Sequence, residues 1–198
     1  MKEREYEQLL NIHTEGFQQG FPQSLHYHRY EPTPYWVLKF LIEFFEFNEG
    51  DHLVDFGCGK GRLGFFVHYF TGAGTTGIEM EEHYFIEAED NLETYRGRNS
   101  GKNALEFYCC LAQDYKVKEL ENIFYFFNPF SVKILMKVIN NILISAEQHS
   151  RDIYALFYYP SEDYIFFLEN KTPFQLEREI TLGSHPGERI LIYKLSHL

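Results

Sequence analysis

Residues 54–62 read Val-Asp-Phe-Gly-Cys-Gly-Lys-Gly-Arg, and this stretch decides the expected fold. Its glycines follow a short apolar run, His52 to Phe56, that predicts a β-strand. Alternate glycines let the backbone approach a ligand without a Cβ in the way, and the helix expected from Arg62 presents free N–H groups at the same place. A nucleotide-like ligand is the natural occupant of such a turn.

The glycine cluster is also compatible with a dinucleotide-binding turn or with a purely structural one. Residues Gly59 to Gly64 satisfy the G-x-G-x-x-G pattern of dinucleotide-binding proteins, with the acid Glu79 placed 20 residues after Gly59. That interpretation leaves Asp55 and Gly57 without a role. A glycine turn with a purely structural purpose is the third possibility.

Strand and helix patterns alternate outward from this turn. Such alternation predicts βαβ crossovers and a mainly parallel sheet, and a last pair of strand-like runs predicts a C-terminal antiparallel hairpin. A helix before the first strand is expected to have Thr33 as its N-cap, Pro34 in its first turn and Gly50 at its end. The expected helices are 33–50, 62–70, 82–95 and 132–145, and the expected strands are 52–56, 75–79, 105–110, 123–127, 153–158, 174–182 and 189–195.

The composition indicates one folded domain. The chain has 198 residues, a formal charge of −11 and 18% aromatic residues, a content that excludes a disordered chain. The acidic balance weighs against tight, non-specific nucleic-acid binding, which needs many Lys and Arg side chains. We expect a single domain over 1–198, in which residues 1–32 form an N-terminal lid or appendage and residues 33–198 form the core.

The chain lacks other signals of location or metal binding. No apolar run approaches the length of a membrane span, and the N-terminus has no signal-peptide pattern, so we expect no membrane partner and a cytoplasmic protein. Three cysteines, two of them adjacent, form no metal-binding spacing. His26 and His28 stand two residues apart with no third ligand nearby, so no metal site is predicted.

The glycine stretch resembles the first motif of the class I S-adenosylmethionine-dependent methyltransferases, an acid at a strand end followed by G-x-G-x-G. Asp55, Gly57, Gly59 and Gly61 supply every position of that motif. The resemblance covers residues 33–198. It implies an α/β fold with a Rossmann-like, doubly wound, seven-stranded, mainly parallel sheet, a C-terminal antiparallel hairpin and an N-terminal helical lid.

The resemblance also implies which residues bind the cofactor, S-adenosyl-L-methionine. Glu79, at the end of the second strand, would accept hydrogen bonds from the ribose hydroxyls, because a carboxylate can take both. Asp114 would accept one from the adenine amino group, beside Gln113. The full set of expected cofactor-binding residues is Asp55, Gly57, Cys58, Gly59, Gly61, Glu79, Met80, Gln113, Asp114 and Asn128.

Asn128-Pro129-Phe130 follows the fourth strand, where amino-methyltransferases of this family carry Asn or Asp, Pro, Pro and an aromatic residue. This chain has one proline before the aromatic residue, so the match is partial and puts a planar amine acceptor in doubt. We assign catalytic roles to Asn128 and Tyr30. The expected substrate pocket consists of Pro129, Phe130, Tyr158, Tyr159 and Tyr35, suited to a flat or apolar acceptor.

Three functions fit these features. The first is methyl transfer to a small-molecule or protein acceptor, which the acidic charge favours. The second is methylation of nucleic-acid amino groups, which only Asn128-Pro129-Phe130 favours. The third is a non-catalytic protein that binds the cofactor or a partner on the same fold.

Overall fold

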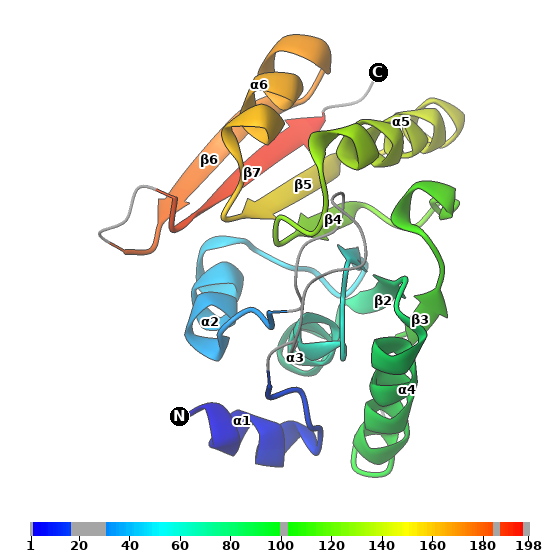
Figure 1. The fold of residues 1–198 in the computed structure, drawn as a ribbon, viewed down its shortest axis with the longest axis vertical. Helices are drawn as coiled ribbons and strands as arrows, with labels where there is room; N and C mark the ends of the chain where they lie inside the picture. The colour runs from blue at the N-terminus through cyan, green and yellow to red at the C-terminus, as the bar shows by residue number, and fades with distance from the viewer. Residues whose placement is uncertain (1, 17–30, 100–102, 184–186, 196–198) are drawn as a thin grey trace.

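A seven-stranded sheet forms the centre of the molecule in the computed structural model, which describes residues 2–16, 31–99, 103–183 and 187–195 (Figure 1). The strand order is β3-β2-β1-β4-β5-β7-β6, and β7 runs antiparallel to both of its neighbours. The expected parallel sheet with a C-terminal antiparallel hairpin is confirmed. The strands are β1 (His52–Phe56), β2 (Gly74–Glu79), β3 (Leu105–Cys109), β4 (Ile123–Phe126), β5 (Ile153–Tyr158), β6 (Gln175–Thr181) and β7 (Arg189–Leu195).

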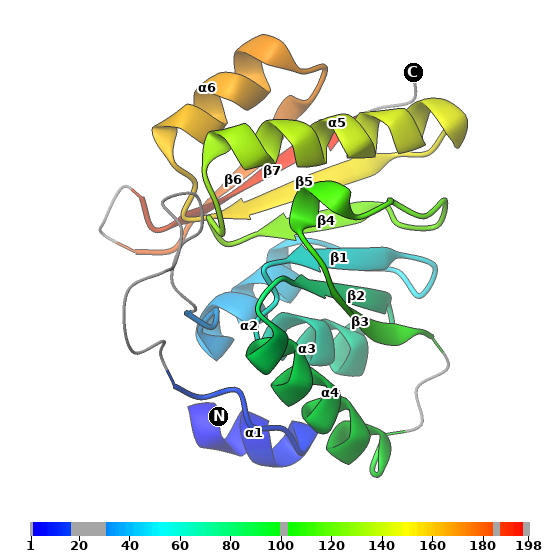
Figure 2. The same ribbon diagram turned by 45° about the vertical axis from the view of Figure 1, so that its right-hand side comes forward.

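Helices cover both faces of the sheet (Figure 2). One apolar core joins the sheet to α1, α2, α3 and α4, and a second core joins the opposite face to α5 and α6. Where a crossover helix would connect β3 to β4, the described chain has only the 3-10 turn η1 (Ala112–Asp114). The helices are α1 (Glu3–Leu10), α2 (Tyr35–Phe44), α3 (Arg62–Thr71), α4 (Glu82–Arg96), α5 (Val132–Gln148) and α6 (Glu162–Lys171).

The helix before the first strand is shorter than expected. Pro34, not Thr33, is the N-cap residue of α2, and the helix ends at Phe44 instead of continuing to Gly50. At Phe45 the backbone becomes extended, and the Phe45 ring packs against Phe47 and against Tyr154 of β5. Burial of this ring in the core therefore decides where the helix ends, a tertiary effect that the helical periodicity does not reveal.

The pairing of the strands brings the turns that follow them to one edge of the sheet. In the register of the three central strands, Asp55 of β1 lies between Gly77 of β2 and Tyr125 of β4. Since β1 to β5 are parallel, their carboxyl ends meet at the same edge, which is where open α/β sheets bind ligands. The turns after these strands thus form one continuous region.

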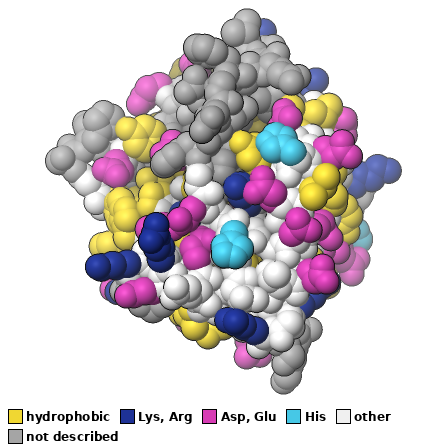
Figure 3. Space-filling model, turned by 60° about the horizontal axis from the view of Figure 1, so that its bottom comes forward, with side chains coloured by type: hydrophobic (Ala, Val, Ile, Leu, Met, Phe, Trp, Pro, Cys, Tyr) yellow, Lys and Arg dark blue, Asp and Glu magenta, His cyan; other side chains and the backbone are white. Residues whose placement is uncertain are grey.

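On the face in Figure 3, acidic and basic side chains are interspersed, and the described residues form no continuous basic stripe there. None of the described helices is both long enough and apolar enough to cross a membrane.

Candidate functional site

The turn after β1 has the left-handed backbone that glycine favours. Gly57, Gly59 and Gly61 have φ angles of 79°, 54° and 86°. The backbone N–H groups of Gly57 and Cys58 both donate to the carbonyl of Ile78, at 2.8 and 3.1 Å, so the turn is tied to the end of β2. These φ values strain any residue with a side chain, which is why glycines occupy alternate positions.

Position 57 also needs a glycine because Pro129 lies too close for a side chain. A Cβ at this position would stand 2.8 Å from the Cβ of Pro129, in the turn after β4. The two turns are therefore in direct contact, although 72 positions separate residue 57 from residue 129. Gly57 is nonetheless exposed, so its backbone is open to a ligand at this edge.

Glu79 organises the turn through its carboxylate. One oxygen accepts from the N–H of Gly59 at 2.9 Å, and the other accepts from those of Met80 and Glu81, at 2.9 and 2.8 Å. Burial raises the pKa of this carboxyl group, and the three backbone donors oppose that shift. A carboxylate has about four acceptor positions, so Glu79 retains capacity for a ligand hydroxyl.

Asp55 is a buried acid without a counter-charge. It is 6% exposed, and its carboxyl group makes no hydrogen bond or ion pair with any part of the chain that the structure describes. Burial and the neighbouring Glu79 carboxylate raise its pKa to about 8. Two buried carboxyl groups side by side destabilise each other's charge, an arrangement that a cationic ligand would relieve.

A buried tyrosine beside Asp55 was not predicted from the sequence. Tyr125 is 1% exposed, is paired in register with Asp55, and forms a hydrogen bond of 3.1 Å between its hydroxyl and that of Thr33. Its signal in the sequence was a hydroxyl group within the otherwise apolar strand Ile123-Phe-Tyr-Phe126. Only the pairing of β1 with β4 shows that this side chain lies on the same face of the sheet as that of Asp55.

The first residue of α3, Arg62, connects the glycine turn to the N-terminal segment. Its guanidinium donates to Thr14 at 2.7 Å and to Glu3 at 3.0 Å, and it lies 3.4 Å from a carboxylate oxygen of Glu7. It also lies over the ring of Tyr35, 4.5 Å from the centroid. A buried arginine, here 5% exposed, is stable only when its charge and its N–H groups have partners. Because two of these partners belong to α1, Arg62 holds that helix beside the turn.

Tyr35, expected in the substrate pocket, belongs to this buried cluster. It is 1% exposed, donates its hydroxyl to Glu7 at 2.7 Å, and stacks on Tyr6 with ring centroids 4.7 Å apart. Burial and the Glu7 carboxylate raise the pKa of its hydroxyl. The structure thus places Tyr35 where it anchors α1. Tyr30, expected to be catalytic, lies outside the described residues.

The remaining residues expected to bind the cofactor follow β1, β2 and β3. Cys58 is buried, and burial raises the pKa of its thiol. Met80 is half-buried and follows Glu79 directly. Gln113 is half-buried in η1, where its carbonyl accepts from Asn141 at 2.8 Å, and Asp114 is exposed next to it. All of them lie at the carboxyl edge of the sheet.

The turns after β4 and β5 contain the acceptor-side residues. Asn128 and Tyr159 have positive φ angles, 41° and 54°, which are unusual outside glycine and cluster at functional sites. Tyr158 is 4% exposed, whereas the Tyr159 ring is 38% exposed. Phe130 lies in the core, 2% exposed with its ring against Phe126, so its ring is not positioned to stack on an acceptor.

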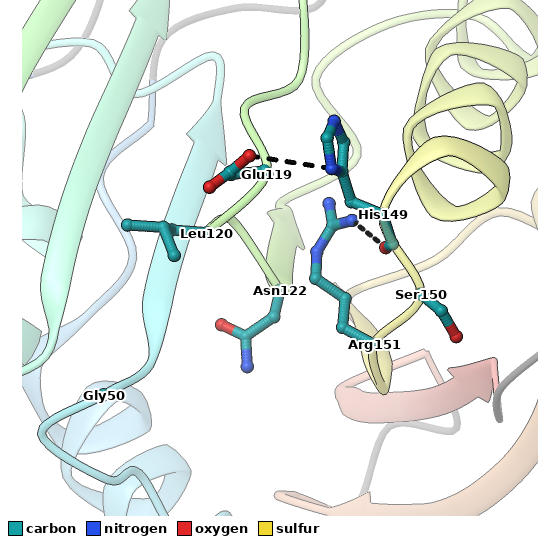
Figure 4. Close-up of a pocket in the computed structure, with 7 residues that line it drawn as sticks. All are labelled: Gly50, Glu119, Leu120, Asn122, His149, Ser150 and Arg151. Carbon is teal, nitrogen blue, oxygen red and sulfur yellow. Dashed lines mark hydrogen bonds and ion pairs between the residues drawn. The ribbon is translucent and has the colours of Figure 1, made fainter.

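A pocket lies at the opposite, amino edge of the sheet (Figure 4). It has a volume of about 460 Å³ and includes Asn122 and Arg151, which precede β4 and β5. Arg151 donates to the carbonyls of Glu121 and His149, both at 2.7 Å, so its guanidinium is already bound by backbone carbonyls. We interpret this pocket as the structural contact between the loops that precede the strands.

Comparison with known proteins identifies the fold. The chain superposes on an RNA methyltransferase from Salinibacter ruber in complex with S-adenosyl-L-homocysteine, with a TM-score of 0.58 and 19% identity over 84% of this chain and 93% of that one. This chain has the class I methyltransferase fold. No protein-family model and no curated protein sequence matches it.

Two further solved structures share this methyltransferase fold. A tRNA (uracil-54, C5)-methyltransferase from Pyrococcus abyssi has a TM-score of 0.56 and 15% identity over 80% of this chain, but over only 36% of its own. The pyocyanin biosynthetic protein PhzM has a TM-score of 0.59 and 16% identity over 79% of this chain and 53% of its own. Identities this low establish the fold and leave the acceptor open.

Proposed function

We propose that this chain is an S-adenosylmethionine-dependent methyltransferase. The observation that carries the proposal is the pair of buried carboxyl groups, Asp55 and Glu79, beside the left-handed turn at Gly57. The dinucleotide alternative does not account for Asp55, whereas a cofactor with a sulfonium and an α-amino group supplies the positive charge that this acid lacks.

The residues present fit such a cofactor. The exposed backbone of Gly57 allows close approach, and the Glu79 carboxylate retains acceptor capacity for ribose hydroxyls. Asp55 would accept from the amino group. Cys58 and Met80 would border the cofactor, and Gln113 and Asp114 would frame the adenine. We keep Asn128 as the residue that orients the acceptor, because its turn contacts Gly57 through Pro129.

The cofactor, when bound, supplies a methyl group on a sulfonium that is already activated for displacement. The protein's task is then to position the acceptor and exclude water, and a base is needed only where the acceptor must lose a proton. Asn128 and Tyr159, held in unusual backbone conformations at the ends of β4 and β5, are suited to positioning.

Calorimetry tests this proposal without knowledge of the acceptor. Titration with S-adenosylmethionine, its demethylated product, NAD and ATP should give heat with the first two only. Asp55→Ala and Glu79→Ala should each weaken cofactor binding at least tenfold, about 1.4 kcal/mol. Glu147→Ala, at an exposed position on α5, is the control. Unchanged titration curves for both site variants would reject the assignment.

Methylation of nucleic acid is the second candidate, favoured by the partial motif at Asn128. Salt-sensitive binding to RNA or DNA would support it. A cofactor-binding protein without catalysis is the third, and tight cofactor binding with no turnover in a broad extract would favour it.

A further inference from the structure

Three aromatic rings gather at the carboxyl ends of β4 and β5. The ring centroids of Phe127 and Tyr158 are 4.5 Å apart, and those of Tyr158 and Tyr159 are 6.1 Å apart with the rings nearly perpendicular. Tyr159 directly follows β5 and has a positive φ of 54°. Phe127 and Tyr158 pack in the same apolar core as Tyr125, which is paired in register with Asp55, so these two rings lie on the Asp55 side of the sheet.

The hydroxyl of Tyr158 is available to form a hydrogen bond with a ligand. The residue is 4% exposed, yet its hydroxyl makes no hydrogen bond to any residue that the structure describes. Burial, followed by the carboxylates of Glu188 and Glu31, raises the pKa of this hydroxyl to about 12. The backbone brings the segments that carry both glutamates to this edge. The N–H of Tyr159 donates at 3.1 Å to the carbonyl of Arg189, next to Glu188, and the hydroxyl of Thr33, two residues after Glu31, lies 3.1 Å from that of Tyr125.

Neither of these carboxylates is neutralised by the described part of the chain, in which Glu31 and Glu188 have no ion pair. The guanidinium of the adjacent Arg189 instead lies 3.0 Å from Glu179 and 3.8 Å from Glu162, and its buried Nε has no hydrogen-bond partner in the described part of the chain. The Glu188 carboxylate is also confined by the backbone opposite. It fills the space in which a Cβ at Gly183 would stand.

We propose that Phe127, Tyr158 and Tyr159, with Glu31 and Glu188, form the binding site for a protonated amine, which is the methyl acceptor. Ring faces attract a cation electrostatically, and the two carboxylates add the opposite charge and accept its N–H groups. An anionic acceptor, including a phosphate backbone, would be repelled by the same two side chains.

This inference rests on the proposed methyltransferase function, and it gives the transfer a defined chemistry. The bound ammonium first loses one proton to a carboxylate, which passes it to water. The nitrogen lone pair then forms the new nitrogen–carbon bond, while the carbon–sulfur pair leaves with sulfur. The sulfonium becomes a neutral thioether, and the positive charge passes to the methylated amine.

Binding of charge-matched probes tests the site. Calorimetry with the demethylated cofactor present compares 2-phenylethylamine, neutral 2-phenylethanol and anionic 3-phenylpropanoate, which share a ring and a short chain. We expect the amine to bind at least tenfold more tightly than the alcohol, and the anion to bind least. The amide of Nα-acetyl-lysine forms a parallel arm that distinguishes a protein amine from a free small molecule.

Variants then assign the preference to the named side chains. Glu31→Gln and Glu188→Gln should each weaken amine binding at least fivefold and leave both the alcohol and the demethylated cofactor unaffected. Glu147→Gln, which changes the charge by the same amount on α5, should change nothing. Tyr158→Phe keeps the ring and removes the hydroxyl, and it should also reduce the amine preference.

The outcomes separate this inference from the proposed function. Equal binding of amine and alcohol by the wild type, or tighter binding of the anion, would overturn the amine site even if a glutamate variant failed to fold. Absence of any heat with the cofactor and its product would instead reject the methyltransferase proposal, and the amine series repeated without them would still test the charge preference.

Discussion

Asp55 is a carboxyl group that the folded protein keeps protonated to an unusually high pH. Its pKa in the fold is about 8, because of burial and the nearby Glu79. An aspartate in an unfolded chain titrates near 4. Between these two values the native state holds one proton more than the unfolded state, so the free energy of unfolding falls as the pH rises.

Asp55→Asn should remove this dependence, because an amide does not ionise. From pH 5 to pH 8 the free energy of unfolding of the wild type should fall, and that of the variant should not. The difference between the two proteins should therefore shift by roughly 1–3 kcal/mol in favour of the variant over this range. Urea denaturation of both proteins at pH 5 and pH 8 measures this difference. Cofactor binding by the same variant should be lost. Parallel stability curves for the two proteins would show that Asp55 ionises normally.

At the scale of elements, the contact between two turns makes Gly57 a position for glycine alone. Alanine there would combine a φ of 79° with a Cβ at 2.8 Å from that of Pro129. We expect Gly57→Ala to destabilise the protein by about 1–3 kcal/mol and to abolish cofactor binding.

Gly50→Ala is the matched control for that substitution. Its added Cβ would meet nothing within 4 Å, and its backbone is not left-handed. It should change stability by about 0.5 kcal/mol or less. Thermal unfolding and cofactor titration of the two variants test the comparison, and equal effects would mean that the two turns are not coupled as described.

The attachment of α1 depends on one buried glutamate. Glu7 is 6% exposed and accepts from Thr14, Tyr35 and Arg62. Glu7→Ala leaves these donors and the Arg62 charge without that partner, so it should cost about 2–3 kcal/mol.

Hydrogen exchange shows where that stability is lost. In the Glu7 variant, protection should fall chiefly in residues 3–16, whereas Gln8→Ala, at an exposed position of the same helix, should leave protection unchanged. A uniform loss over the whole sheet would show that α1 does not detach as a unit.

At the scale of the whole molecule, the charge of −11 opposes binding to nucleic acid, even though several proteins of similar fold are RNA methyltransferases. We expect no shift of a labelled tRNA at about 10 µM protein and about 150 mM salt in an electrophoretic assay. Tight binding that weakens linearly in a log–log plot against salt would contradict this expectation and revive the nucleic-acid candidate.

The order of the elements and the position of the glycine turn could be predicted from the sequence alone. The alternation of strands and helices, the three glycines and the acids Asp55 and Glu79 are local patterns, and local patterns suffice to predict a parallel sheet and its binding edge. The structure bears out the strand boundaries at 52–56, 153–158 and 189–195.

Which side chains meet at that edge depends on the three-dimensional packing of the chain. Tyr125 is paired with Asp55 by strand register, and Arg62 reaches Glu7 from 55 positions away. The N–H of Tyr159 donates to the carbonyl of Arg189, next to Glu188, because β5 and β7 are neighbours in the sheet. The same packing moved Tyr35 and Phe130 from the expected pocket into the core. Contacts between residues distant in sequence arise from sheet pairing and burial, which periodicity in a single chain does not encode.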